Sequence, residues 1–129
     1  MLKPLFILLF MFVSGALAAQ EADSSKIYKT VEYPKGFTAQ LNVVYTTVNG
    51  WEGKVDIYLP PKTNKPTPVL INIHGGGWNH GKKEEQGGFS TFFKAGFAVA
   101  NIEYRLTGQA TAPAAVEDTR CALIYLIKN

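Results

Sequence analysis

The chain has 129 residues, of which 47% are hydrophobic and 18% are charged, with 13 Lys and Arg against 10 Asp and Glu. This is the composition of one ordinary globular domain, and it excludes a disordered, collagen-like, disulfide-stapled or coiled-coil protein. The longest basic run is the pair Lys82–Lys83. Because nucleic-acid binding needs a larger basic patch, no nucleic-acid partner is expected.

Residues 1–18 have the order of a secretory signal peptide. Lys3 stands near the start, residues 5–13 form an unbroken apolar run, and small residues lead to Ala18. This order of charge, apolar core and small-residue cleavage site predicts removal of the segment after Ala18 or Ala19. The mature protein is therefore expected to be secreted or periplasmic.

A membrane anchor is the competing interpretation of the same segment. The apolar stretch 5–19 contains Ser14 and Gly15, and it is shorter than the roughly 20 apolar residues that a membrane span needs. We therefore expect no stable membrane anchor. Export would permit disulfides, but Cys121 is the only cysteine, so it has no partner within the chain.

Residues 19–38 are polar, and we interpret them as an irregular lead-in to a domain over residues 39–129. Residues 41–47 then alternate between apolar and polar side chains, a period of two that predicts a half-buried strand. Asn49–Gly50 offers a turn that tolerates positive φ, and alternation resumes over residues 55–59. The two runs predict an antiparallel hairpin.

Two further strands are expected after a proline-rich loop over residues 60–68. Residues 69–74 are almost continuously apolar, which is typical of a strand covered on both faces, as in a parallel sheet. A second buried strand is predicted over residues 97–106.

Helices are predicted between and after these strands. Phe89, Phe92 and Phe93 form one apolar helical stripe, and Gly96 stands where such a helix would be capped. Pro113 opens the last helix. Its apolar face, at 100° per residue, contains Val116, Thr119, Leu123 and Ile127. Asp118 and Tyr125 are expected on the opposite face.

This order of elements predicts an α/β fold. An antiparallel hairpin leads into parallel strands joined by crossover helices, and such crossovers are right-handed.

The segment His74-Gly75-Gly76-Gly77-Trp78 follows the predicted strand 69–74 directly. Three consecutive glycines leave the backbone free of side chains, so their N–H groups can approach a ligand closely. Two such donors aimed at a carbonyl oxygen would stabilise the negative charge that develops in acyl transfer. The segment thus suggests an oxyanion hole.

Two other interpretations of the glycines stay open. Residues 76–83 match the phosphate-binding pattern G-x-x-x-x-G-K-[ST] except at the last position, where Lys83 replaces the magnesium-binding hydroxyl. Bulky Trp78 also lies inside that loop. The simpler alternative is a glycine loop that only permits a tight turn.

Three segments together resemble a known family. The strand ending in H-G-G-G-W, the strand ending in Tyr104-Arg105-Leu106, and residues 112–123 are similar to α/β-hydrolases of the carboxylesterase and hormone-sensitive-lipase-like group. That group includes secreted feruloyl- and acetyl-esterase-like members. The resemblance implies an incomplete α/β-hydrolase sheet over residues 39–129.

The resemblance also implies roles for the glycine segment. The N–H groups of Gly75, Gly76 and Gly77 would form the oxyanion hole, and His74 would shape the loop without acting as the catalytic base. Trp78 would line an acyl pocket or pack the loop. The substrate would be a small-molecule or polysaccharide-linked ester, with no cofactor.

The catalytic triad of that family is missing from this chain. Its serine stands in a G-x-S-x-G elbow, whereas the serines beyond the signal peptide are Ser24, Ser25 and Ser90, and none has that context. No histidine follows Ser90. We therefore expect the N-terminal portion of a secreted serine ester hydrolase that is inactive alone. The alternative is a non-catalytic secreted module that binds a carbohydrate or acyl group.

The remaining charged residues suggest structural roles. The two histidines, His74 and His80, have no carboxylate or thiolate at metal-ligand spacing, so no metal site is expected. Arg105 is expected to pair with a carboxylate, Asp118 or Glu103. Glu84, Glu85 and Asp118 are interpreted as solvated or capping charges. With the family's fifth strand absent, residues 69–74 would become an exposed sheet edge.

Overall fold

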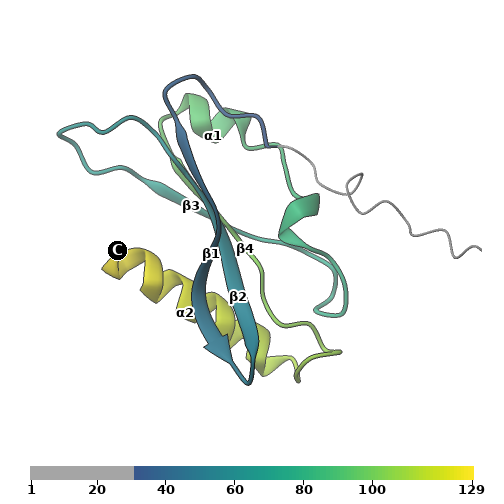
Figure 1. The fold of residues 1–129 in the computed structure, drawn as a ribbon. Coiled ribbons are helices and arrows are strands. Elements are labelled where there is room, and N and C mark those ends of the chain that lie inside the picture. The colour runs from purple at the N-terminus through teal and green to yellow at the C-terminus, as the bar shows by residue number, and fades with distance from the viewer. Residues whose placement is uncertain (1–30) are drawn as a thin grey trace, which may run out of the picture.

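The structure is a computed structural model that describes residues 31–129 (Figure 1). The predicted signal peptide, residues 1–18, and residues 19–30 of the predicted lead-in lie outside this described part. Residues 31–37 precede the first strand without regular structure.

One four-stranded mixed sheet organises the fold. Its strands are β1 (Thr38–Val48), β2 (Trp51–Leu59), β3 (Val69–Ile73) and β4 (Ala98–Ile102), in the order β1-β2-β4-β3. The pairs β1–β2 and β2–β4 are antiparallel, and β3–β4 is parallel. This arrangement confirms the predicted fold class, a hairpin leading into parallel strands.

The hairpin turn lies where the sequence predicts it. Asn49 and Gly50 have φ values of 48° and 81°, and positive φ at both central residues is the requirement of a type I′ turn. Its twist matches the twist of the flanking strands.

Strand β1 departs from the simple alternation predicted over residues 41–47. Its register against β2 shifts between Gln40 and Val43 and again between Val44 and Thr46. At the first irregularity Asn42 has a φ of 55°, and its N–H donates to Asp56 Oδ1 at 2.8 Å. An inserted residue reverses the side of the sheet that the following side chains face. Leu41, next to Asn42 in this irregularity, is 59% exposed.

The predicted bounds of β3 and β4 are corrected at their C-terminal ends. Strand β3 ends at Ile73, and β4 begins at Ala98 and ends at Ile102, well before the predicted Leu106. The chain leaves the sheet because the N–H of Arg105 donates to Asp118 Oδ2 at 2.9 Å instead of to a strand.

The helices are α1 (Ser90–Lys94) and α2 (Pro113–Lys128), with a short 3₁₀ helix, η2, over Lys83–Glu85. Gly96 has a φ of 81°, and its N–H donates to Phe93 O, so the predicted glycine cap is confirmed. Among residues 31–129, no helix is both long enough and apolar enough to span a membrane.

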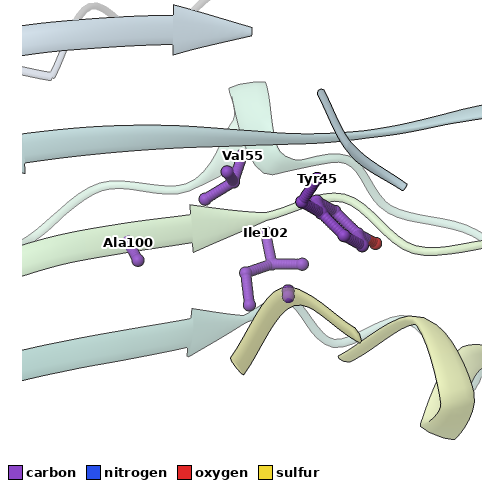
Figure 2. Packing of buried hydrophobic residues seen from close by; sticks show 5 residues of the cluster. Tyr45, Val55, Ala100 and Ile102 are labelled. Atoms are coloured by element: carbon purple, nitrogen blue, oxygen red, sulfur yellow. The ribbon is translucent and has the colours of Figure 1, made fainter. Parts of the chain in front are cut away.

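The two helices pack on opposite faces of the sheet. Side chains of β4 alternate, so Ala100 and Ile102 face α2, whereas Val99 packs with Phe89 and Phe93 on the α1 side. Figure 2 shows Tyr45, Val55, Ala100 and Ile102 gathered in the cluster that Ala122 of α2 completes. Burial of these side chains supplies the main stabilisation of the fold.

Helix α2 uses a different face from the predicted one. Its buried residues are Ala114, Ala115, Asp118 and Ala122. The predicted apolar face is largely exposed, with Val116 at 63% and Ile127 at 75%. The small alanine side chains let the helix approach the sheet closely, and the Arg105 guanidinium holds Asp118 on the inner side.

The predicted exposed edge is confirmed at β3. Among the described strands it pairs only with β4, and Val69 and Ile73 are 49% and 53% exposed. Beside this edge lies a groove of about 310 Å³ between β3 and the exposed side of α2. Its lining consists of Ile71, Ile73, Val116, Thr119, Arg120 and Leu123.

Candidate functional site

The glycine loop follows β3 at its C-terminal end. We define it as residues 74–83, from His74 to Lys83. The carbonyl oxygen of Gly76 accepts hydrogen bonds from the N–H groups of Asn79, at 3.1 Å, and His80, at 3.2 Å. These bonds fold the loop into a tight turn next to β3.

Glycine is required at some positions of this loop and not at others. Gly76 and Gly77 have φ values of 121° and 57°, and a Cβ at Gly76 would collide with the carbonyl oxygen of His80. Gly75 has no left-handed conformation, and a Cβ there would meet nothing within 4 Å. Among the three consecutive glycines, the strict requirement therefore falls on Gly76.

The amide groups of the three glycines are unpaired within the described part of the chain. The N–H groups of Gly75, Gly76 and Gly77 donate to no acceptor in residues 31–129, whereas the carbonyls of Gly75 and Gly76 are engaged. Unpaired backbone donors next to one another can bind an anionic oxygen.

His74 anchors the start of the loop from a buried position. It is 3% exposed, and its ring stacks on Tyr104, with centroids 4.2 Å apart and planes 15° apart. The Tyr104 hydroxyl donates to the His74 carbonyl at 2.8 Å. His74 Nδ1 lies 2.8 Å from Gly75 O, and Nε2 lies 3.6 Å from Glu103 Oε1.

Two opposing effects set the pKa of His74. Burial disfavours the charged ring and lowers its pKa, but the Glu103 carboxylate, the Gly75 carbonyl and the more distant Glu85 carboxylate outweigh burial. The net pKa therefore lies above the ordinary value of histidine.

Trp78 occupies an unusual backbone conformation at the tip of the loop. Its φ is 63°, which is strained for a bulky residue, and the residue is 54% exposed. The N–H of Thr107 donates to Trp78 O at 2.8 Å and holds this conformation. The indole lines a shallow cavity of about 80 Å³ together with Ile73, Tyr104 and residues of α2.

Lys83, at the end of the loop, is buried, which contradicts the phosphate-loop alternative. Its Nζ lies 2.9 Å from both oxygens of Asp56 and 2.8 Å from Glu84 Oε1. A lysine sequestered by two carboxylates has no free charge for a phosphate. Glu84 is consequently an ion-pair partner and not the solvated charge predicted, and Lys83 lowers its pKa against the effect of burial.

The predicted partner of Arg105 is confirmed, but the predicted environment of Asp118 is wrong. Asp118 is 1% exposed and accepts from Nε of Arg105 at 2.9 Å and from its Nη2 at 2.8 Å. A buried carboxylate in a bidentate pair is neither solvated nor a helix cap. The guanidinium also lies 5.7 Å from the centre of the Trp51 ring.

The described residues bring no serine together with a histidine. Ser90 is exposed in the first turn of α1, and no hydrogen bond joins it to His74 or His80. Ser24 and Ser25 lie outside the described residues. Within residues 31–129, no group of three or more His, Cys, Asp or Glu side chains is placed to hold a metal ion.

Sequence reasoning missed two contributors to this site. Neither the burial of Lys83 nor the role of Glu103 between His74 and Lys83 was predicted. A signal for the first was present, because Asp56 is a carboxylate between the apolar residues Val55 and Ile57 of β2 and needs a cationic partner when buried.

Comparison with known proteins identifies the family. The BD-FAE family model matches residues 55–129. Carboxylic ester hydrolase LipN of Mycobacterium tuberculosis is 37% identical over 116 residues, which are 88% of this chain and 30% of LipN. Carboxylesterase NlhH of the same organism is 28% identical over 107 residues, 78% of this chain and 33% of NlhH.

A solved structure agrees with these sequence matches. The structure titled "Bacterial Heroin Esterase" has a TM-score of 0.57 and 36% identity, and the match covers 71% of this chain and 30% of that one. The chain thus spans about a third of the length of the relatives it matches. These matches favour the hydrolase hypothesis over the non-catalytic module. The chain belongs to the BD-FAE family and has the fold of the N-terminal portion of an α/β-hydrolase of the esterase group.

Proposed function

We propose that this chain carries the oxyanion-hole loop of an exported serine ester hydrolase. In that reaction a serine attacks the ester carbonyl, and the carbonyl oxygen becomes an alkoxide. The N–H groups of Gly75, Gly76 and Gly77 would donate to this oxygen. Each well-placed donor typically contributes about 3 kcal/mol to transition-state stabilisation.

One observation carries the proposal: three consecutive N–H groups have no acceptor in residues 31–129, while the neighbouring carbonyls of Gly75 and Gly76 are engaged. Gly75 and Gly77 are exposed and Gly76 is half-buried, so these donors are accessible to a ligand from solvent. The similarity to proteins named carboxylesterase and carboxylic ester hydrolase supports an ester as the ligand.

The nucleophile, acid and base would come from the part of a hydrolase that this chain does not contain. We therefore propose that the chain alone does not hydrolyse esters. A p-nitrophenyl acetate assay of the isolated chain is expected to show no turnover. Hydrolysis that disappears in the Ser90→Ala variant would contradict this, because it would make Ser90 a nucleophile.

A chimera tests the role of the loop directly. Residues 31–129 would replace the matching third of LipN, which would supply the remaining hydrolase fold. We expect the chimera to hydrolyse p-nitrophenyl acetate. Gly75→Pro removes one N–H, and its kcat should fall about 10²- to 10³-fold.

Gly75→Ala is the matched control for that variant. It keeps the N–H, and its Cβ meets nothing within 4 Å, so its kcat should stay near that of the parent chimera. Equal kcat values for the alanine and proline variants, or a folded chimera without activity, would refute the oxyanion role.

Export is a separate proposal that rests on residues 1–18. Expression of the whole chain in a bacterium with a general secretion system should yield a product cleaved after Ala18 or Ala19. The intact mass of the exported protein identifies the cleavage site. Recovery of only the uncleaved chain would contradict it.

A further inference from the structure

Glu103 connects the two ends of the glycine loop through one carboxylate. It is the first residue after β4, and its backbone is fixed on both sides. Its N–H donates to Lys54 O at 2.9 Å, and its carbonyl accepts from the Tyr45 hydroxyl at 2.6 Å. The side chain therefore projects from a rigid point of the sheet.

The two carboxylate oxygens of Glu103 face different ends of the loop. Oε1 lies 3.6 Å from Nε2 of His74, and Oε2 accepts from the N–H of Lys83 at 3.0 Å. His74 and Lys83 flank residues 75–82, which include Gly75, Gly76 and Gly77. A single side chain thus fixes the separation between the first and last residues of the loop.

The surroundings of His74 make the carboxylate its only ionic partner within ion-pair distance in the described residues. One ring nitrogen, Nδ1, faces the Gly75 carbonyl oxygen and must carry a hydrogen to bond with it. The other, Nε2, is buried, without a hydrogen bond among residues 31–129, and faces Glu103 at ion-pair distance. A second hydrogen on Nε2 makes the ring a cation that this carboxylate attracts.

The ends of the loop also meet each other. A Cβ at Gly81 would lie 2.6 Å from Gly75 O and 2.7 Å from His74 Nδ1. The start and end of the loop are therefore in close contact where Glu103 holds them. A shift of His74 would move Gly75 directly, because the ring contacts the Gly75 carbonyl.

We propose that Glu103 is a positioning residue that clamps the base of the glycine loop through His74 and Lys83 and so sets the direction of the Gly75–Gly77 amides. The value of these amides for catalysis rests on the proposed function, but the clamp is a property of the loop itself. Glu103 touches no reacting atom and acts only through its two neighbours.

Hydrogen exchange measured by mass spectrometry tests the clamp on the chain as it exists. Exchange at the imidazole C2 position gives the titration midpoint of each histidine, and His80 serves as the internal reference. In Glu103→Gln, which keeps an oxygen to accept from Lys83 but removes the charge, the His74 midpoint should fall relative to that of His80.

Amide exchange in Glu103→Ala reports the position of the loop. The N–H groups of Asn79, His80 and Thr107 hold the turn through Gly76 and Trp78. Their exchange should accelerate about tenfold or more, while exchange in β4 stays unchanged. Glu52→Gln is the matched control, since its carboxylate is 52% exposed and pairs only with Lys54 among the described residues. It should alter neither readout.

An unchanged His74 midpoint in Glu103→Gln would overturn the clamp, even if Glu103→Ala unfolds. The two proposals fail separately. If Glu103→Gln does not change the His74 midpoint, the Gly75→Pro result in the chimera still stands. If Gly75→Pro does not lower the kcat of the chimera, the His74 midpoint still tests the clamp.

Discussion

Lys83 and Asp56 form an ion pair that is almost completely removed from solvent. The Lys83 side chain is 3% exposed and that of Asp56 10%, and Nζ lies 2.9 Å from both carboxylate oxygens. The side-chain oxygen Oδ1 of Asn42 also accepts from Nζ at 2.9 Å. The ion pair connects the end of the glycine loop to β2. The hydrogen bond to Asn42 connects Lys83 to the bulge of β1 as well.

Replacing Lys83 should therefore be costly. Lys83→Met leaves Asp56 buried without its cation, and loss of one partner of a buried pair typically costs about 3–5 kcal/mol of unfolding free energy. Lys82→Met is the matched control, because Lys82 is the exposed neighbour. Its effect should stay within about 0.5 kcal/mol. Urea unfolding measures both, and equal effects would show that the pair contributes nothing.

Gly76 and Gly75 should differ sharply in their tolerance of alanine. Gly76→Ala introduces a left-handed alanine and a collision with the His80 carbonyl oxygen. Backbone strain of this kind costs about 1–3 kcal/mol before the collision is counted. Gly75→Ala meets no atom within 4 Å and should change the unfolding free energy by less than about 1 kcal/mol. Thermal or urea unfolding of the two variants, compared side by side, decides the point.

His74 should make the stability of the chain fall as pH rises through neutrality. Its pKa in the folded state is raised above that of the unfolded chain. A raised pKa contributes stability that is complete below the unfolded pKa, about 6.5, and is lost as pH rises through the folded pKa. Each unit of difference corresponds to about 1.4 kcal/mol.

The measurement is the free energy of unfolding at several pH values between about 5.5 and 8.5. His74→Gln is the comparison, since it removes the titrating ring while keeping a polar side chain. The fall with pH should be smaller in this variant. If both proteins show the same pH dependence, His74 does not have a raised pKa in the folded state.

The exposed β3 edge should promote self-association. Its pairing with β4 is regular over Val69–Ile73, so the outer side presents unpaired backbone groups, and the adjacent groove is apolar. Ile73→Lys should reduce concentration-dependent association at least several-fold, as measured by sedimentation velocity.

Leu41→Lys is the control for association. Leu41 is also exposed, but it lies on β1, whose two bulges disrupt an edge for pairing. We expect little effect. Equal effects of the two substitutions would mean that the association is non-specific and does not use the β3 edge.

Much of the scaffold of the site was predictable because its signals are local. The Asn49–Gly50 turn, the apolar strand before His74 and the Gly96 cap each depend on a few adjacent residues. Their backbone requirements are visible in the residue types themselves. The glycine segment was recognisable for the same reason, since absence of side chains is a property of the sequence.

Tertiary structure alone decided which side of α2 is buried. Periodicity places Val116 and Ile127 on one face and Asp118 on another, but it does not say which face meets the sheet. Arg105, which holds Asp118 inward, and the alanines that permit close approach determined the outcome. The buried ion pair and the small alanine side chains therefore decided which face of α2 packs on the sheet. The apolar stripe instead borders the groove beside β3.

The sequence by itself determined the order of elements, the hairpin and the position of the three consecutive glycines after β3, since these depend on residues that are neighbours in the chain. Only the tertiary structure decided that Lys83 is buried against Asp56 and that Glu103 lies between His74 and Lys83. Those contacts join residues far apart in sequence. Their energies depend on burial and distance, and neither quantity exists until the chain has folded.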